Sequence, residues 1–491
     1  MYTESQLPQP RIESLFAGLF FLIIVLLLVT LSAESSALFY ENEPWQALAV
    51  SMAIYSFLLT LIYVATRQFA VWIKRHKPLA YGILNITLIS YLLVYHYVFA
   101  SHRIIPFSFA NALTSLFLYF LGLAVYHMAA HQKQFLYPGA EIETRWDYAS
   151  KQLRMWIPFA LPFLLFTFLF DVLLILPENQ WTSLLLYPEN TPGSLLIFFS
   201  FTASVVVLIM IFLPYFIQKM WLCEKIEDTE LWLRLTKTCQ KANFRYAGLR
   251  IWTVMNNFHT AAIIGVIPRF RYVMFTKSLL YEVPAECIDA ILIHEIGHSY
   301  RKHLLILPFI LFGMFALPSL FSLIFFDAFH QALTLMDVTY PSKFWTFLFP
   351  FTIFVPYVVI MAIYFRLVFG FFSRLFERQA DLHSYVVGSP PEAMIDALDQ
   401  IGIATGNTHN NPSWHHYSIS ERISFLKKAL EQPEIIEKHH KSVRRWVTTY
   451  FIAFAAVCSI LFSSSLTQLY PFNQINEFVE KISTAISGVI Q

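Results

Sequence analysis

Five consecutive residues in the second half of the chain, His294-Glu295-Ile296-Gly297-His298, have the types and spacing of a metal-binding site. Residues four apart lie one turn above each other on an α-helix, so His294 and His298 would present their imidazoles on one face. Neutral imidazole nitrogen suits Zn²⁺, and Glu295 beside it could take the proton of a water whose pKa the metal has lowered to roughly 7. The pattern therefore predicts metal-assisted hydrolysis of an amide bond, with one Zn²⁺ per chain.

A helix must present these side chains, and the sequence indicates where it begins. Pro284 suits a first helical position, and Glu286 and Asp289 place negative charge near the positive end of the helix dipole. We expect this helix to run from Pro284 to about His303. Because H-E-x-x-H can arise by chance, the metal site also requires a third ligand.

The segment Ser373–Asp381 offers that ligand. Glu377 and Asp381 are four residues apart and would share one helical face. Glu377 can complete a His₂Glu zinc site and leave the fourth position open for water. Asp381 would accept the N–H of a ligand histidine and fix its tautomer. The alternative is that Glu377 and Asp381 lie at an ordinary solvated helix end. A position of both motifs on the same side of a membrane would argue against this alternative.

The composition predicts a membrane protein. Hydrophobic residues make up 57% of the chain and charged residues only 13%, against about 25% charged in soluble proteins. The net charge of +2 is spread over the loops, so no basic patch points to nucleic acid. The four cysteines lack C-x-x-C spacing and predict neither a zinc knuckle nor a disulfide framework.

Long apolar runs predict about nine transmembrane helices. Their approximate bounds are Leu15–Leu31, Trp45–Ala65, Leu79–Ala100, Phe107–His127, Ile157–Leu176, Ser194–Ile217, Leu304–Phe326, Phe344–Gly370 and Trp446–Leu469. The chain would then divide into a six-span membrane region (1–217), the first half of a catalytic domain (218–303), a transmembrane hairpin (304–370), the second half of the domain (371–445), and a ninth span with an amphipathic tail (446–491). The expected fold is a polytopic α-helical membrane protein with a mixed α/β, mainly helical, zincin-like catalytic domain.

Basic residues follow the even-numbered spans, whereas the loops after odd-numbered spans contain almost none. The positive-inside rule then places the amino terminus and both polar segments in the cytoplasm and the carboxyl terminus outside. Both halves of the catalytic domain would meet on the cytoplasmic face. The apolar positions of the tail, over about Phe472–Ile486, have helical spacing and predict a helix on the membrane surface or against a span.

Together these motifs resemble the integral-membrane gluzincin peptidases typified by the CAAX prenyl proteases and HtpX. The resemblance covers about Leu249–Leu426 and includes three elements: His294-Glu295-x-x-His298, Ser373-Arg374-x-x-Glu377-x-x-Ala380-Asp381, and His416-Tyr417-Ser418 continuing to Arg422-Ile423, where Tyr417 replaces the usual proline. It implies a zinc endopeptidase whose substrates are hydrophobic, membrane-associated or misfolded polypeptides. One extra span at each end departs from both types, so whether the substrate is prenylated stays open.

Three short stretches rich in β-branched and aromatic residues, about Arg250–Val254, Ala261–Val266 and Tyr272–Thr276, predict a small antiparallel sheet. In the family that the chain resembles, an edge strand receives the substrate as an added strand through main-chain hydrogen bonds. Asn257 lies at the position that resembles this edge. The alternative is a structural hairpin without substrate contact.

Ser418-x-x-Glu421 is a capping box, so a helix should begin just after His415 and His416. We expect His416 to donate a hydrogen bond to the developing oxyanion or to act as a transient fourth zinc ligand, although His415 could take the role instead. Arg422 would pair with a carboxylate near the site. Plain surface positions are the alternative for both histidines.

Two other functions compete with this hypothesis. An intramembrane site-2-type metalloprotease also begins from H-E-x-x-H, but it takes its third ligand from an Asp-Gly pair, and no Asp in this chain precedes Gly. A catalytically idle membrane scaffold or transporter that retains zinc is the other. Proteolysis assayed with and without a chelator separates that scaffold from an enzyme.

Overall fold

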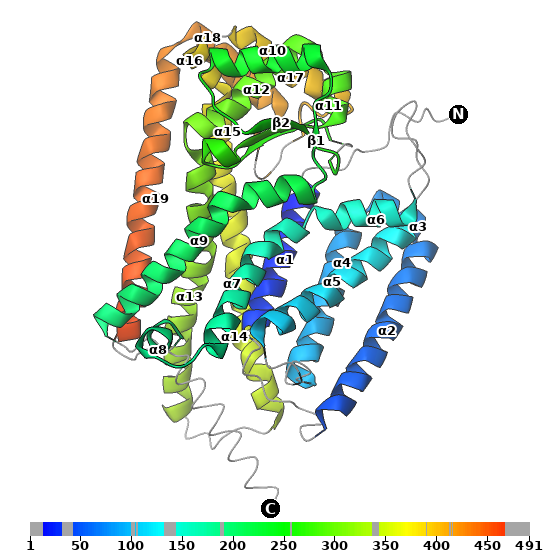
Figure 1. Ribbon diagram of the computed structural model, residues 1–491, viewed down its shortest axis with the longest axis vertical. Coiled ribbons are helices and arrows are strands. Elements are labelled where there is room, and N and C mark those ends of the chain that lie inside the picture. The colour runs from blue at the N-terminus through cyan, green and yellow to red at the C-terminus, as the bar shows by residue number, and fades with distance from the viewer. Residues whose placement is uncertain are drawn as a thin grey trace, which may run out of the picture. The chain divides into compact units, whose positions relative to one another are not determined.

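The computed structural model describes residues 13–31, 43–99, 104, 107–131, 144–186, 191–255, 258–335, 343–388, 390–411, 414 and 416–466. Helices dominate this part of the chain, and the strands form one small sheet (Figure 1). Eight helices are long and apolar enough to cross a membrane, and α1 (Glu13–Leu31) adds a shorter apolar stretch over Gly18–Val29. The prediction of a mainly helical, polytopic membrane protein with about nine spans is confirmed. The predicted amphipathic tail, about Phe472–Ile486, lies outside the described residues.

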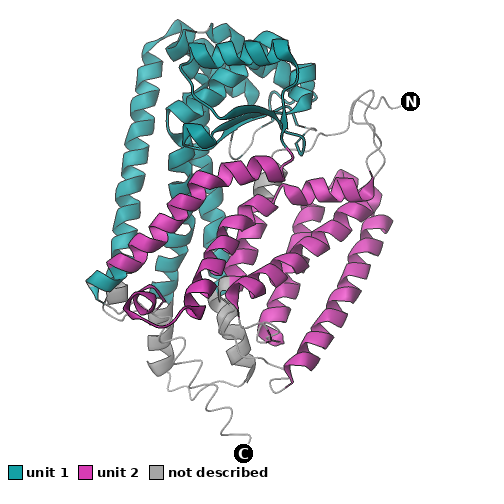
Figure 2. Cartoon of the chain, in the orientation of Figure 1, with its two compact units in different colours: residues 1–9, 190–195, 223–491 teal, residues 10–189, 196–222 magenta. Residues whose placement is uncertain are grey.

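The chain forms two compact units (Figure 2). Unit 1 contains residues 1–9, 190–195 and 223–491, and unit 2 contains residues 10–189 and 196–222. The helices of unit 2 are α1, α2 (Pro44–Gln68), α3 (Ala70–Arg75), α4 (Lys77–Leu93, continued by the π-helix η2, Val94–Val98), α5 (Ser108–Ala130), α6 (Arg145–Arg154), α7 (Ile157–Ile175), α8 (Gln180–Leu186) and α9 (Pro192–Met220) from Leu196 onward. Since α9 continues to Met220, it passes the expected boundary at residue 217.

In unit 2, α5 packs against α1, α2, α4, α6 and α7. An acidic side chain inside a membrane span is costly unless it is paired. Asp171 of α7 is buried, and its carboxylate accepts the backbone N–H groups of Ser108 at 3.1 Å and Phe109 at 2.7 Å. It therefore satisfies donors that the first turn of α5 leaves free, and it joins α5 to α7.

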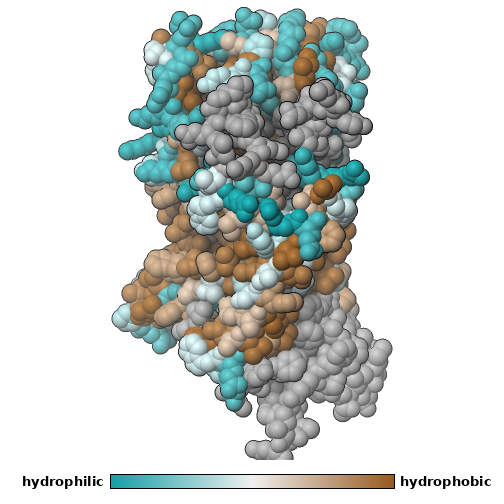
Figure 3. Space-filling view, turned by 90° about the vertical axis from the view of Figure 1, so that its right-hand side faces the viewer, coloured by the Kyte–Doolittle hydropathy of each residue, from teal (hydrophilic) through white to brown (hydrophobic). Residues whose placement is uncertain are grey.

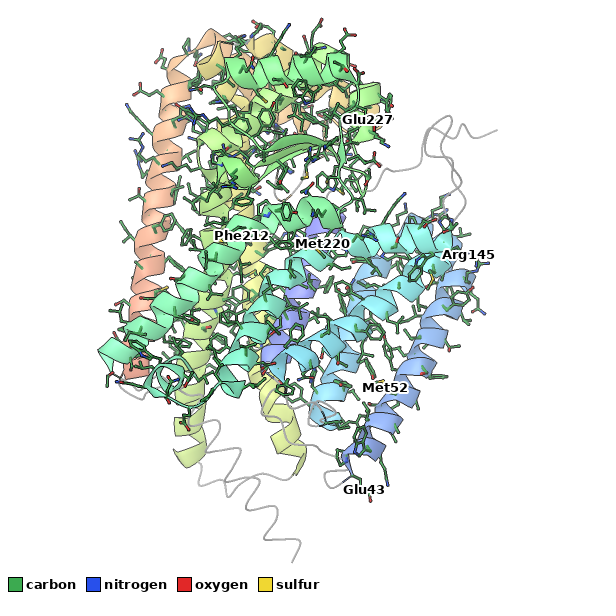
Figure 4. All side chains as sticks on the ribbon, in the orientation of Figure 1. Glu43, Met52, Arg145, Phe212, Met220 and Glu227 are labelled. Carbon is green, nitrogen blue, oxygen red and sulfur yellow. The ribbon has the colours of Figure 1, made fainter. Side chains whose placement is uncertain are left out.

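The loops of unit 2 differ in charge from one end of the bundle to the other. Glu43 precedes α2 at one end, and Arg145 begins α6 at the opposite end (Figure 4). Met220, the last residue of α9, lies toward the same end as Arg145. An acidic loop and a basic loop at opposite ends of a bundle are the asymmetry on which the positive-inside rule relies.

Three long helical segments in unit 1 carry its apolar spans. They are α13 (His303–Leu335), α14 (Lys343–Tyr364), which continues through the π-helix η5 (Phe365–Phe369), and α19 (Glu434–Leu466). The Tyr364 hydroxyl donates to Ile310 O of α13 at 2.7 Å and lies 3.0 Å from the Tyr450 hydroxyl of α19. This contact joins all three. Because α19 is unbroken from Glu434, no break separates the expected second catalytic half from the ninth span.

The remaining elements of unit 1 form a compact α/β assembly at one end of these helices (Figure 1). They are β1 (Glu224–Lys225), α10 (Thr229–Lys241), β2 (Gly248–Ile251), β3 (Ala261–Ile264), the 3₁₀-helix η4 (Pro268–Phe270), β4 (Tyr272–Phe275), α11 (Lys277–Glu282), α12 (Ala285–Tyr300), α15 (Gly370–Asp381), α16 (His383–Val387), α17 (Pro391–Ala404) and α18 (Ile419–Glu431). Hydrophilic residues gather on the surface of this assembly (Figure 3).

The sheet has the strand order β1-β2-β4-β3. Its outer pairs, β1 with β2 and β3 with β4, are antiparallel, but β2 and β4 run parallel, with Leu249 opposite Val273. The expectation of an antiparallel sheet was therefore wrong for this central pair. The chain between β2 and β4 forms β3 on the far side of β4, so β4 enters the sheet in the direction of β2. All four residues of β4 are buried, as expected for an inner strand.

Helix α12 lies at the centre of the assembly and packs against α10, α15, α16, α17 and β3. Its apolar side chains, including Ile288, Ile291 and Leu292, join the core formed by Val273 and Phe275 of β4. Pro284 is the N-cap rather than the first helical residue, and the helix ends at Tyr300, three residues before the expected end. The cause is a left-handed backbone at Lys302, φ 61°, after which α13 begins.

Candidate active site

Helix α12 presents the two histidines of the motif on one face. His294 and His298 are one turn apart, and their Nε2 atoms lie 3.2 Å from each other. The His294 side chain is buried and that of His298 is partly buried. Two ring nitrogens therefore converge on one point, as the i, i+4 spacing predicts.

Helix α15 brings a carboxylate to the same point. Glu377 Oε2 lies 3.7 Å from His294 Nε2, and Glu377 Oε1 lies 3.5 Å from His298 Nε2. One ligand atom from each of these residues lies within 4.8 Å of the other two, so the three could hold a metal ion. The π-helix η5 joins α15 directly to the span before it, so the membrane hairpin α13–α14 returns Glu377 to α12.

Gly297 allows α12 and α15 to approach closely. A Cβ atom at this position would lie 2.8 Å from the Cβ of His383 and 3.1 Å from the carbonyl oxygen of Ala380, one residue before Asp381. These atoms belong to backbone or to a first side-chain carbon and cannot turn aside. Any larger residue must therefore push the two ligand-bearing segments apart.

We expect Gly297→Ala to lower stability by about 1–3 kcal/mol, as overpacking generally does, and to weaken metal binding because Glu377 moves away from the histidines. Thermal unfolding and zinc titration of the detergent-solubilised chain measure the two effects. Gly82→Ala is the control, since no atom lies within 4 Å of its added Cβ. Equal stability and zinc affinity in the two variants would contradict the close-packing argument.

Asp381, one turn after Glu377, connects the site to α18. Its Oδ1 lies 2.9 Å from His294 Nδ1, and its carboxylate accepts two hydrogen bonds from Arg422, at 2.9 Å from Nε and 2.6 Å from Nη2. Arg422 Nη1 also lies 3.4 Å from Glu377 Oε2. Asp381 is fully buried, and the bidentate pair compensates its charge. The prediction that Arg422 pairs with a carboxylate near the site agrees with this geometry.

The charges around the site shift the ionisation of the residues on α12 and α18. Burial lowers the pKa of His298 well below its usual value, which favours the neutral ring that binds metals. At His294 burial opposes the charged form, but the Asp381 carboxylate outweighs it and raises the pKa. Burial is likewise outweighed by Asp381 at Arg422, whose pKa is raised. Burial raises the pKa of Glu295 to about 7.

The Glu295 carboxylate faces the edge of the sheet. It accepts a hydrogen bond from the backbone N–H of Ile263 in β3, and it feels the charges of His294 and Glu377. A carboxyl group with a pKa near neutrality can take a proton and return it at neutral pH. Glu295 is thus placed between the cluster of His294, His298 and Glu377 and the outer strand of the sheet.

The segment before α18 brings His416 to the cluster. Its Nδ1 lies 3.4 Å from Glu377 Oε1. Arg374 of α15 donates to the carbonyl oxygen of Trp414, and Arg378 of α15 lies 3.6 Å from the centre of the Tyr417 ring. Tyr417, which stands where the resemblance implied proline, thus fixes the segment by a cation–π contact. His415 and Asn257 lie outside the described residues, so their predicted roles stay predictions.

The capping box that was predicted before α18 is present. Ser418 accepts from the backbone of Glu421, and the Glu421 carboxylate accepts from the backbone of Ser418. Three further polar residues near the site were not predicted: His303, Gln379 and His440. His303, five residues after His298, and Gln379, two residues after Glu377, lie close in sequence to predicted ligands, whereas His440 has no such signal.

These observations define a class of protein: a multi-pass membrane protein whose extramembrane α/β assembly holds two histidines and a glutamate in a metal-binding arrangement. Residues 227–430 match the sequence model of Peptidase family M48. This part of the chain is therefore similar to the peptidases of that family, and it lies in a protein whose apolar helices are long enough to cross a membrane. No curated protein matches the chain. Among solved structures, the crystal structure of S. mikatae Ste24p is similar, with 14% identity and a TM-score of 0.37 over 78% of this chain and 98% of that one.

Proposed function

We propose that this protein is a zinc-dependent endopeptidase that hydrolyses peptide bonds of hydrophobic, membrane-associated or misfolded polypeptides on the cytoplasmic side of its membrane. The observation that carries the proposal is the convergence of His294, His298 and Glu377 beside Glu295, within a domain of a peptidase family. Neither motif could form this site alone. His294 and His298 supply two ligands, and Glu377, which lies beyond a membrane hairpin in the sequence, supplies the third.

The donor set fits Zn²⁺. Asp381 lies at Nδ1 of His294, so that ring carries its proton on Nδ1 and directs the lone pair of Nε2 toward His298 and Glu377. Two imidazole nitrogens and one carboxylate oxygen are the ligands of a catalytic zinc site that keeps one position open. Bound there, zinc would polarise the scissile carbonyl group and lower the pKa of a coordinated water to roughly 7.

The residues around this position supply the proton transfers. Glu295 takes a proton from the attacking water and later gives it to the leaving amine nitrogen, which its pKa of about 7 permits. His416, beside Glu377, donates a hydrogen bond to the negative charge that develops on the carbonyl oxygen. Asp381 and Arg422 hold the ligand helices in place through their bidentate pair.

The outer edge of β3 suits an extended substrate. Thr260 O accepts the N–H of Thr276 at 3.1 Å, so on this alternating strand the backbone groups of Ala261 and Ile263 face away from β4. The contact between Ile263 N–H and Glu295 supports this orientation. A peptide that pairs with Ala261 and Ile263 would pass beside Glu295, and its main-chain hydrogen bonds would impose little sequence preference.

Cleavage of casein and of an unfolded membrane protein by the purified full-length chain tests the proposal. We expect proteolysis that a zinc chelator abolishes and that added Zn²⁺ restores. Cleavage that resists the chelator would contradict the zinc mechanism. Bound zinc without cleavage of any substrate would favour the idle scaffold or transporter instead. One peptide compared with and without a farnesyl group then determines whether a lipid is part of the substrate.

The cytoplasmic placement rests on the basic loops and has its own measurement. We propose that residues 223–303 and 371–433 face the cytoplasm, with the amino terminus on the same side and the carboxyl terminus outside. Single cysteines introduced at exposed positions such as Glu286 and Glu392, labelled with an impermeant maleimide in intact cells and in opened membranes, report the side. Labelling in intact cells would contradict the assignment.

A further inference from the structure

The two zinc-ligand histidines proposed above have different outer partners. Asp381 lies at Nδ1 of His294, but among the described residues no carboxylate forms an ion pair with Nδ1 of His298. Instead, His298 Nδ1 lies 3.0 Å from Nδ1 of His303, the first residue of α13. A metal-binding histidine needs a partner for its second nitrogen, because that partner fixes the tautomer and the orientation of the ring.

His303 is held so that it can serve as this partner. It is 1% exposed, and its ring stacks on Phe376 of α15 with the ring centres 4.2 Å apart and the planes 8° from parallel. Its other nitrogen, Nε2, lies 2.9 Å from Oε1 of Gln379, also on α15. An amide oxygen only accepts hydrogen bonds, so Nε2 carries the proton and Nδ1 is left with its lone pair facing His298.

The contacts continue outward. Gln379 Nε2 lies 3.0 Å from Nδ1 of His440 on α19, and an amide nitrogen only donates. Each contact from His298 to His440 thus has one donor and one acceptor, in the direction that leaves the Nε2 lone pair of His298 free for a metal. Arg301 Nη2 lies 2.9 Å from His440 Nε2, and because a guanidinium also only donates, this contact is a hydrogen bond only in the other tautomer of His440.

We propose that His303, oriented by Gln379, is the positioning residue of the second zinc ligand: it accepts the Nδ1 proton of His298 and so directs His298 Nε2 at the metal. The proposal rests on the zinc site proposed above. The outer partners of His298 are then the neutral residues His303 and Gln379, whereas the outer partner of His294 is a carboxylate. The proposal also ties the metal site to the beginnings of two spans, α13 and α19.

Two complementary substitutions separate the hydrogen bond from the packing. His303→Phe keeps a flat ring against Phe376 but removes the acceptor. His303→Asn loses the ring but places an amide oxygen where Nδ1 stood, which can still accept from His298. His439→Phe is the matched control, because His439 is the neighbour of His440 and contacts the carbonyl oxygen of Leu375 and the ring of Phe425.

Two measurements on the full-length chain in detergent serve as readouts. One is the zinc affinity, measured by competition with a chromophoric chelator, and the other is the visible absorption of the Co²⁺-loaded protein. We expect His303→Phe to bind zinc roughly 10- to 100-fold more weakly and to change the cobalt spectrum, because the ring of His298 can turn. His303→Asn should recover most of the affinity and the spectrum, and His439→Phe should match the parent chain.

Wild-type zinc affinity and an unchanged cobalt spectrum in a folded His303→Phe protein would overturn the inference. So would a His303→Asn protein that is folded but as defective as His303→Phe, since packing alone would then explain the loss. If the parent chain itself bound no zinc, the failure would lie with the proposed function. If His303→Phe does not fold, the comparison of His303→Asn with the parent still tests whether an acceptor suffices.

Discussion

Replacement of Glu295 by Gln is expected to reduce the rate of proteolysis by about 10²- to 10⁴-fold while zinc remains bound, because removal of a general base costs about that factor and Glu295 is not one of the three ligands. Glutamine keeps the length of the side chain and can still accept the N–H of Ile263 through its carbonyl oxygen. It cannot take a proton from water. Turnover of casein and zinc content per chain, measured on the same preparation, give both numbers.

Glu286→Gln is the matched control for this variant. Glu286 lies on the same helix, nine residues earlier, and its side chain is exposed. It should retain full activity and full zinc content. Substantial residual proteolysis in Glu295→Gln would refute the assignment of the base, and a loss of zinc in that variant would mean that Glu295 takes part in binding the metal.

The part of the site that could be predicted from the sequence depends on local geometry. His294, His298, Glu377 and Asp381 lie on two helices, and residues four apart on a helix share a face whatever surrounds it. The eight long apolar helices of the described residues could be predicted for a similar reason, because the length of an apolar run largely decides whether it can cross a bilayer.

Features that depend on distant parts of the chain could not be predicted in this way. The parallel pairing of β2 with β4 depends on where β3 inserts, and short apolar stretches do not reveal their partners. The helix break at Lys302 has no glycine or proline to signal it. Gln379 and His440 approach His303 from two other helices, so no spacing in the sequence connects them.

The contacts of Tyr417 in the structure show a role that its sequence position does not indicate. Tyr417 departs from the pattern of the family that the chain resembles, in which proline is usual at this position. In the structure, the Tyr417 ring lies against Arg378, and the segment still brings His416 within 3.4 Å of Glu377. The cation–π contact of Tyr417 therefore holds the segment that carries His416.

Replacement of Glu377 by Ala is expected to abolish both zinc binding and proteolysis, because it removes one of three ligands and the only one that bears a negative charge. The loss of affinity should exceed the roughly 10- to 100-fold that removal of an outer carboxylate costs. Asp381→Asn provides that comparison, since Asp381 contacts His294 and Arg422 from outside the ligand set. Zinc titration of the three proteins in detergent gives the order of affinities.

The expected order is the parent chain, then Asp381→Asn, then Glu377→Ala. The fold should survive the loss of Glu377, because Arg422 keeps its two hydrogen bonds to Asp381 and is not left as an unpaired buried charge. Thermal unfolding of the zinc-free proteins tests this point. An unchanged zinc affinity in a folded Glu377→Ala protein would remove Glu377 from the ligands, and with it the argument that two segments separated by a membrane hairpin share one metal.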